Sequence, residues 1–278
     1  MNLHHAGNVL CLIRVMNMAN ETRRQKAIKA RGQMIVKAND LIRKTRYDLS
    51  VQQQKLVLYC ISKIKPNDKP DMWYEISIAD ICQACNLDLD GGGRYYRIIK
   101  DDLQQLTNRL WVQMPDKTER TASWISDAII TPYSGTVKIR FHEAMEPYLF
   151  QLRQQYTMYH LEDVLVLRGK HAIRLFELLR SYTTQKAIDE GQTRKVVLPL
   201  QELRELLAVP TYPRWADFDR FVIRKAADEI NACNADLHID YRPIRAGHNV
   251  AQVEFTISSP RALQALSAIR KRKERLGE

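Results

Sequence analysis

The chain carries the same succession of predicted elements twice, and this repeat limits the possible folds more than any other feature. Each half predicts a helix, a strand, a short helix, a turn, a long helix and a pair of β-strands. In the first half these are the helix that starts at Ser50, the strand 73–76, the short helix 78–85, a helix with apolar residues from Tyr96 to Leu110, the β-type stretches 109–114 and 123–130, and the strand 137–141. In the second half they are a helix with an apolar face over 172–179, the strand 195–198, the short helix 200–207, the long helix 214–231, and the strands 237–241 and 250–257.

This order is that of the winged helix-turn-helix, in which a β-hairpin follows the second helix of the motif. Two such units predict an α+β fold with two tandem winged-helix domains. Ser50 followed by Gln53 predicts a capping box at the start of the first helix. We expect an N-terminal extension at 1–35, a first domain at 36–158, a second domain at 159–258, and a basic C-terminal tail at 259–278.

The chain is strongly basic, with 43 Lys and Arg against 32 Asp and Glu, a formal net charge of +11. Such a charge indicates a polyanionic partner, which is nucleic acid or an anionic membrane. The cationic runs near both ends are either solvated tails or arms that neutralise phosphates. No apolar run reaches the length of about 18 residues that a membrane span needs, because Arg14 stops the run 9–13. Five cysteines are too few for a disulfide scaffold and favour a reducing cytoplasm.

The long helix 214–231 has the two faces that a DNA-recognition helix requires. Its apolar side carries Trp215, Phe218, Val222, Ala226 and Ile230, and its polar side carries Arg214, Asp217, Arg220, Arg224, Asp228 and Asn231. Arginines near its start fit guanine O6 and N7, whereas Arg224 and Lys225 fit phosphate equally well. We predict DNA contacts by four residues of this helix: Arg214, Arg220, Arg224 and Lys225. The alternative is an ordinary amphipathic surface helix.

Two further segments supply candidates for DNA contact. In the helix of the first half these are Arg94, Tyr95, Arg97 and Lys100, and in the last hairpin they are Arg242 and Arg245. We expect weaker or backbone-directed contact from the first group, because cations are fewer there and Gly91-Gly92-Gly93 makes the helix entry loose. The hairpin tip fits a phosphate or the minor groove. The alternatives are a helix that packs on a partner subunit and a solvated hairpin.

No motif points to catalysis, a metal or a cofactor. The glycines 91–93 lack the Gly-Lys-Ser/Thr that completes a Walker loop. Cys82 and Cys85 have no second pair at zinc spacing, so we predict buried thiols there. The seven histidines include no pair flanking a single residue, as a rolling-circle nicking site needs, and His160-Leu161-Glu162 lacks the Pro-Cys-x-x-Cys of a deaminase. We therefore predict a protein that is not an enzyme.

The sequence resembles the iteron-binding plasmid replication initiator (Rep) proteins over 36–257. The resemblance rests on four segments in order, 37–42, 49–56, 172–179 and 218–231. It implies winged-helix domains that bind directly repeated origin sequences as monomers, with the main base contacts at Arg214, Arg220 and Arg224 and further contacts from 94–100. It also implies dimerisation through the first domain and repression of the protein's own promoter at an inverted repeat. Lys63 interrupts the seven-residue spacing of Leu49 and Leu56, which argues against a leucine zipper as the dimer contact.

We predict a sequence-specific DNA-binding initiator of plasmid replication that acts in the bacterial cytoplasm, associated with nucleoid or plasmid. The expected partners are double-stranded DNA with direct and inverted repeats, host replication initiator and helicase proteins, and a second copy in a homodimer, with no membrane. Two alternatives remain: a plasmid or phage transcriptional regulator with two winged-helix units, and a metal-dependent origin-nicking enzyme. Because the first 35 or so residues match nothing in the family pattern, translation from Met16, Met18 or Met34 is a further hypothesis.

Overall fold

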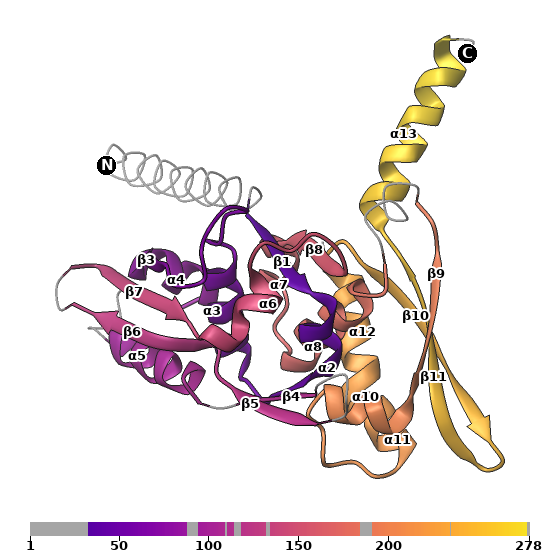
Figure 1. The fold of residues 1–278 in the computed structure, drawn as a ribbon. Coiled ribbons are helices and arrows are strands. Elements are labelled where there is room, and N and C mark those ends of the chain that lie inside the picture. Colours follow the sequence, from indigo (N-terminus) through magenta and orange to yellow (C-terminus); the bar gives the residue numbers. More distant parts are fainter. Residues whose placement is uncertain are drawn as a thin grey trace, which may run out of the picture.

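The computed structural model describes residues 33–87, 94–108, 110–113, 118–131, 134–183, 191–233 and 235–276. The predicted extension therefore lies outside the described residues except for 33–35, and Gly91-Gly92-Gly93 lies outside them entirely. Within the described part, both predicted units are present, one after the other along the chain (Figure 1).

The second half contains the predicted elements in the predicted order. They are α8 (Lys170–Arg180), β9 (Arg194–Pro199), α10 (Leu200–Leu206), α11 (Trp215–Phe218), η2 (Asp219–Ile223), α12 (Arg224–Ala232), β10 (His238–Ala246) and β11 (Asn249–Ser258). The segments α11, η2 and α12 follow without interruption and form one long helix, in which η2 is a π-helical turn. The strands form an antiparallel sheet in the order β10-β11-β9, so the last strand is central.

The first half repeats this topology. Its corresponding elements are α3 (Val51–Ile61), β3 (Trp73–Ser77), α4 (Ile78–Cys85), α5 (Arg94–Leu106), β6 (Ile125–Ile130) and β7 (Thr136–Phe141). The antiparallel sheet has the order β3-β7-β6, and the last strand is again central. The shared topology confirms the α+β class and the two tandem winged-helix units. Helix α5 is shorter than predicted, because it ends at Leu106 and Leu110 begins the next strand.

The helix starts follow from local sequence. At the start of α3 the Ser50 hydroxyl accepts the N–H of Gln53 at 3.2 Å, and the Gln53 side chain accepts the N–H of Ser50 at 3.0 Å, which confirms the capping box. Helix α4 begins where Ser77 accepts the N–H of Asp80, and it ends at Asn86 in the left-handed conformation (φ 58°).

Elements that the sequence did not predict surround the first unit. They are β1 (Met34–Ala38), α2 (Asn39–Lys44), β2 (Thr45–Arg46), β5 (Glu119–Ala122), η1 (Glu143–Met145), α6 (Glu146–Leu149), β8 (Tyr156–His160) and α7 (Leu161–Leu165). Strand β1 pairs antiparallel with β8, and β4 (Leu110–Gln113) lies between β2 and β5. The expected division at 158/159 thus falls within a strand that pairs with the first half, and the domain limits stay a prediction.

Buried polar side chains of α8 join the two halves. Arg174, which is 3% exposed, donates to the carbonyl oxygens of Ile42 and Thr45 at 2.7 Å each and of Leu206 at 3.1 Å. Glu177 forms a buried ion pair with Lys37 of β1 and accepts a hydrogen bond from Tyr159 of β8. Helix α8 thus connects the strands of the first half to α10 of the second.

The end of the chain holds a helix where the sequence predicted only a basic tail. Helix α13 (Pro260–Leu276) projects away from the rest of the molecule (Figure 1). Its first turn is anchored, because Arg261 forms ion pairs with Asp163 at 2.8 Å and with Glu162 at 3.1 Å. Just before the helix, the hydroxyl of Ser259 donates to Asp236 at 2.6 Å.

Candidate nucleic-acid interface

The long helix formed by α11, η2 and α12 has the buried side that the sequence predicted. Six apolar residues on this side are at most 3% exposed: Phe218, Val222, Ile223, Ala226, Ala227 and Ile230. They pack towards α8 and β10 of the same unit. The opposite side of the helix is open to solvent, as a helix that enters a DNA groove requires.

All four cations predicted on this helix lie in its exposed part. Arg214 is the N-cap residue of α11, and Arg220, Arg224 and Lys225 follow along the exposed side. The structure thus places these four cations on one helix. Two acidic residues lie among them, the partly buried Asp217 and the exposed Asp228. A cationic surface of this kind attracts phosphates, and its arginines have the fork geometry that guanine edges accept.

A π-helical turn in the middle of the helix moves one acidic side chain inward. The N–H of Arg224 donates to the carbonyl of Asp219, five residues earlier. Asp219 is only 7% exposed, although its sequence context gave no sign of burial. Turns of this kind insert one residue into a helix and are frequent at functional sites.

Arg224 has a partner within its own domain. Its guanidinium lies 2.5 Å from the Asp219 carboxylate, and the same carboxylate accepts the hydroxyl of Tyr241 at 2.5 Å. Burial, with the hydrogen bond to Asp219, raises the pKa of Tyr241 to about 12, so the hydroxyl stays protonated and donates. Asn231 also serves the fold, because its amide exchanges two hydrogen bonds of 2.8 Å with the backbone of Ile239. These contacts tie the helix to the hairpin behind it.

Sequence analysis missed two aromatic residues beside these cations. Phe221 on the helix and Tyr212 in the preceding turn are 38% and 37% exposed, and their rings stack at 5.2 Å with 27° between planes. The guanidinium of Arg220 lies 5.3 Å and the Nζ of Lys225 lies 5.6 Å from the centre of the Phe221 ring. The position of Phe221 outside the apolar stripe of the helix is the sequence feature that could have predicted its exposure.

Arg204 of α10 holds the turn between the two helices of the motif. Its guanidinium donates to the carbonyl of Tyr212 and, at 3.1 Å, to that of Pro213. It also lies 4.5 Å from the centre of the Phe218 ring, and burial lowers its pKa. Arg204 therefore positions the start of the long helix from behind.

The predicted wing is the hairpin of β10 and β11, with a turn at Gly247 (φ 62°). Arg242 and Arg245 are both exposed on it. Arg242 forms two bonds with Glu254, at 2.9 and 3.1 Å, which keep the pKa of that carboxyl below its usual range. Arg245 donates to the carbonyl of His248 at 3.0 Å. To bind a phosphate, Arg242 would have to release Glu254, and Arg245 would have to release the carbonyl of His248.

Helix α5 presents a smaller cationic surface in the first unit. Arg94, Arg97 and Lys100 are exposed, as predicted, whereas Tyr95 is partly buried and packs against the core. No local sequence pattern predicts the role of Asp102, whose carboxylate accepts amide hydrogen bonds from Gln52 and Gln53 of α3. Burial raises the pKa of Asp102, and its bonds fix α5 on α3.

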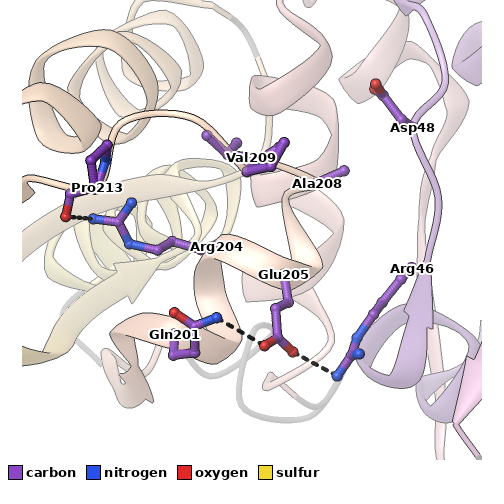
Figure 2. A pocket seen from close by; sticks show the side chains of 9 residues that line it. Arg46, Asp48, Gln201, Arg204, Glu205, Ala208, Val209 and Pro213 are labelled. Atoms are coloured by element: carbon purple, nitrogen blue, oxygen red, sulfur yellow. Dashed lines mark hydrogen bonds and ion pairs between the residues drawn. The ribbon is translucent and has the colours of Figure 1, made fainter.

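A cleft of about 650 Å³ lies between the two halves, beside the turn that precedes the long helix (Figure 2). Glu205 of α10 lies 2.6 Å from Arg46 of β2 and accepts the amide of Gln201 at 3.0 Å. The cleft is lined by nine residues: Arg46, Asp48, Gln201, Arg204, Glu205, Ala208, Val209, Pro210 and Pro213. The ion pair between Arg46 and Glu205 joins the two halves across the cleft, which makes the cleft part of their junction.

The described residues contain no cluster of three or more His, Cys, Asp or Glu side chains arranged to hold a metal ion. Cys82 is buried and Cys85 is partly buried, and burial raises the pKa of both thiols. Across the residues that the structure describes, every helix is too short or too polar to form a membrane span.

Comparisons with known proteins cover both units. The family described as "Initiator Replication protein, WH1" matches residues 34–180, and that described as "Initiator Rep protein, WH2" matches residues 199–257. A "Replication initiation protein" of Escherichia coli is 25% identical over 229 residues, which are 80% of this chain and 70% of that protein. The solved structure of the Pi initiator protein in complex with iteron DNA shares the fold, with a TM-score of 0.67 at 17% identity over 82% of this chain and 98% of that one.

Proposed function

Because the chain belongs to the initiator replication protein family and carries both of that family's winged-helix domains in order, we propose that it initiates plasmid replication by binding repeated double-stranded DNA sites at an origin. The long helix of the second domain enters the major groove, and the wing follows the adjacent backbone. The driving force is binding energy, with no bond chemistry at the protein.

One observation carries this proposal: the long helix turns its apolar side into its own domain and leaves Arg214, Arg220 and Lys225 exposed on the other side. A recognition helix in a winged-helix domain needs this division. The net charge of +11 adds a general attraction to phosphate. The fold shared with an initiator that was solved on iteron DNA supports the same role.

In the first domain, we propose that Arg94, Arg97 and Lys100 make auxiliary contacts, mainly to phosphates. The reason is that α5 carries fewer cations than the long helix of the second domain. We also propose that this domain forms a homodimer that represses the protein's own promoter at an inverted repeat. An isologous dimer matches the two-fold symmetry of such a repeat.

Host replication initiator and helicase proteins are the further partners that we propose. The candidate site residues are cations and hydrogen-bond donors, which hold and deform DNA but do not hydrolyse a nucleotide. The strand-separating enzymes therefore come from the host. This role also places the protein in the bacterial cytoplasm, on the plasmid or the nucleoid.

Footprinting of the purified protein on DNA that flanks its own gene tests the proposal. We expect protection that recurs at a spacing of one or two helical turns, and loss of that protection in Arg214→Ala/Arg220→Ala/Lys225→Ala. Arg153→Ala, which removes an exposed cation in the segment between α6 and β8, is the matched control and should retain the footprint. Absence of repeated protection would contradict the proposal, and Mg²⁺-dependent cleavage of supercoiled origin DNA would indicate a nicking enzyme instead.

A further inference from the structure

Two stacked aromatic rings, Phe221 of the long helix and Tyr212 of the turn before it, are partly exposed to solvent. Phe221 and Tyr212 are among the most exposed large apolar side chains of the second unit, at 38% and 37%. The residues next to Phe221 on the buried side, Phe218 and Val222, are at most 1% exposed. Phe221 therefore lies outside the core. Its exposed apolar surface does not contribute the burial free energy that a core side chain provides, and such surface often marks an interaction site.

The turn holds Tyr212 in a conformation that brings its ring onto Phe221. Tyr212 has φ of 62°, in the left-handed region that bulky residues rarely adopt. Arg204 binds the carbonyl groups of Tyr212 and Pro213 and keeps the turn in place. An unfavourable backbone conformation that surrounding contacts maintain is a feature of binding sites.

Charge indicates which partner meets these rings. Arg220 and Lys225 lie 5.3 and 5.6 Å from the centre of the Phe221 ring, so two cations accompany the exposed aromatic surface. A partner that fits this surface combines negative charge with an apolar group. In the major groove, phosphates supply the charge, and the C5-methyl of thymine is the apolar group on the base edges.

We propose that Phe221, supported by Tyr212, contacts the methyl group of one thymine in the bound site and thereby selects thymine at that position. This inference rests on the proposed function, since it requires that the long helix occupies the major groove. The ring carries no hydrogen-bonding group, so it distinguishes thymine by its methyl alone. The stack with Tyr212 holds the ring before DNA arrives, which reduces the entropy lost on binding.

Replacement of thymine by deoxyuridine tests the contact, because it removes only the methyl. A duplex selected by the wild-type protein from a random pool is resynthesised with deoxyuridine at each thymine in turn. We expect wild-type affinity to fall about 3- to 5-fold at one position, as expected for the removal of one buried methyl group. Phe221→Ala should bind thymine and deoxyuridine equally there, whereas Phe221→Leu should keep part of the difference.

Arg214→Ala is the matched control, because it weakens binding at the helix start and should leave the thymine-to-deoxyuridine ratio at its wild-type value. A ratio of one at every position in the wild type, or a ratio that Phe221→Ala leaves unchanged, would overturn the inference. Failure of the wild type to enrich any duplex would overturn the proposed function itself. Melting temperatures of the variants within a few degrees of wild type show that the exposed positions were changed without unfolding.

Discussion

Arg224 and Asp219 form an ion pair of 2.5 Å inside the helix that we propose to bind DNA. The Asp219 side chain is 10% exposed and belongs to the π-helical turn that ends at Arg224. The arginine, in contrast, is 59% exposed and keeps part of its surface towards solvent. The pair therefore gives Arg224 two functions, since it neutralises a buried charge and contributes to the cationic surface.

Arg220 and Arg224 should consequently respond differently to alanine substitution. Arg220→Ala should weaken binding to the repeat by about 1–3 kcal/mol and change binding to random duplex less, since it removes the base contact that we propose for Arg220. Arg224→Ala should weaken specific binding as well and should also lower the melting temperature, because Asp219 then retains a buried, unpaired charge. Titrations on repeat and random DNA, with thermal unfolding of each variant, measure both effects.

Equal losses of affinity on repeat and random DNA would assign either arginine to phosphate contact. An unchanged melting temperature of Arg224→Ala would mean that Tyr241 alone satisfies the Asp219 carboxylate. Arg224→Lys distinguishes the two functions further, because it retains the charge near Asp219 but loses the fork that binds guanine in two places.

Removal of Lys37 alone from its buried ion pair with Glu177 should strongly destabilise the fold. Both side chains are 1% exposed, so Lys37→Met leaves a buried carboxylate without its cation. We expect a loss of about 3–5 kcal/mol in the free energy of unfolding, measured by urea denaturation. The control is Lys44→Met, which breaks the exposed pair with Asp40 and should cost less than about 1 kcal/mol. Similar losses in the two variants would contradict the expected cost of leaving the Glu177 carboxylate buried without its cation.

The succession of elements could be predicted from the sequence because it is encoded locally. The Ser50–Gln53 capping box and the apolar stripe from Phe218 to Ile230 each depend on residues a few positions apart. The pairing of β1 with β8 could not be predicted in this way, since Met34 and His160 meet only in the folded chain. The same holds for the hydrogen bonds from Arg174 to both halves.

The cations of the candidate site could be predicted from the sequence, whereas its buried aspartate and its exposed aromatic residue were not predicted. Helical spacing predicts that Arg214 and Arg220 lie on the exposed side of the helix. It does not predict which residues of other elements a side chain contacts. The π-helical turn buries Asp219, which no local pattern indicates, and thereby provides Arg224 with its partner. Phe221 was overlooked because an aromatic residue is usually assigned to the core. Helix α13 was overlooked because its charge is typical of a flexible tail.

Stability should rise with pH through the titration of His171 at the start of α8. Burial, together with the charge of Lys170, lowers the pKa of this imidazole, although a bond with the Leu207 backbone and the charge of Asp48 oppose the shift. The unfolded chain therefore binds a proton more readily between the lowered pKa and the ordinary value of about 6.5. The contribution to stability is complete above pH 6.5 and is lost as the pH falls through the lowered value.

Urea denaturation of wild type and His171→Gln from pH 8 to pH 5 measures this linkage. The wild type should lose stability relative to the variant as the pH falls, since the variant cannot bind the proton. His248→Gln, at the exposed hairpin turn, provides the control for removal of one imidazole. A difference between wild type and His171→Gln that stays constant across this range would contradict the prediction.

Removal of residues 268–278 should reduce the salt dependence of DNA affinity. This segment carries Arg270, Lys271, Arg272, Lys273 and Arg275 against two glutamates, and the anchoring residue Arg261 stays in the truncated protein. The slope of log affinity against log salt should fall by about 0.9 for each phosphate that the truncated protein no longer neutralises, because one fewer counterion is released. Binding is measured between 50 and 200 mM salt, a range in which this slope is readily determined. A full-length variant with glutamine at the five basic positions retains the chain length and should show the same reduction. An unchanged slope in both proteins would mean that these charges bind no phosphate and serve another partner.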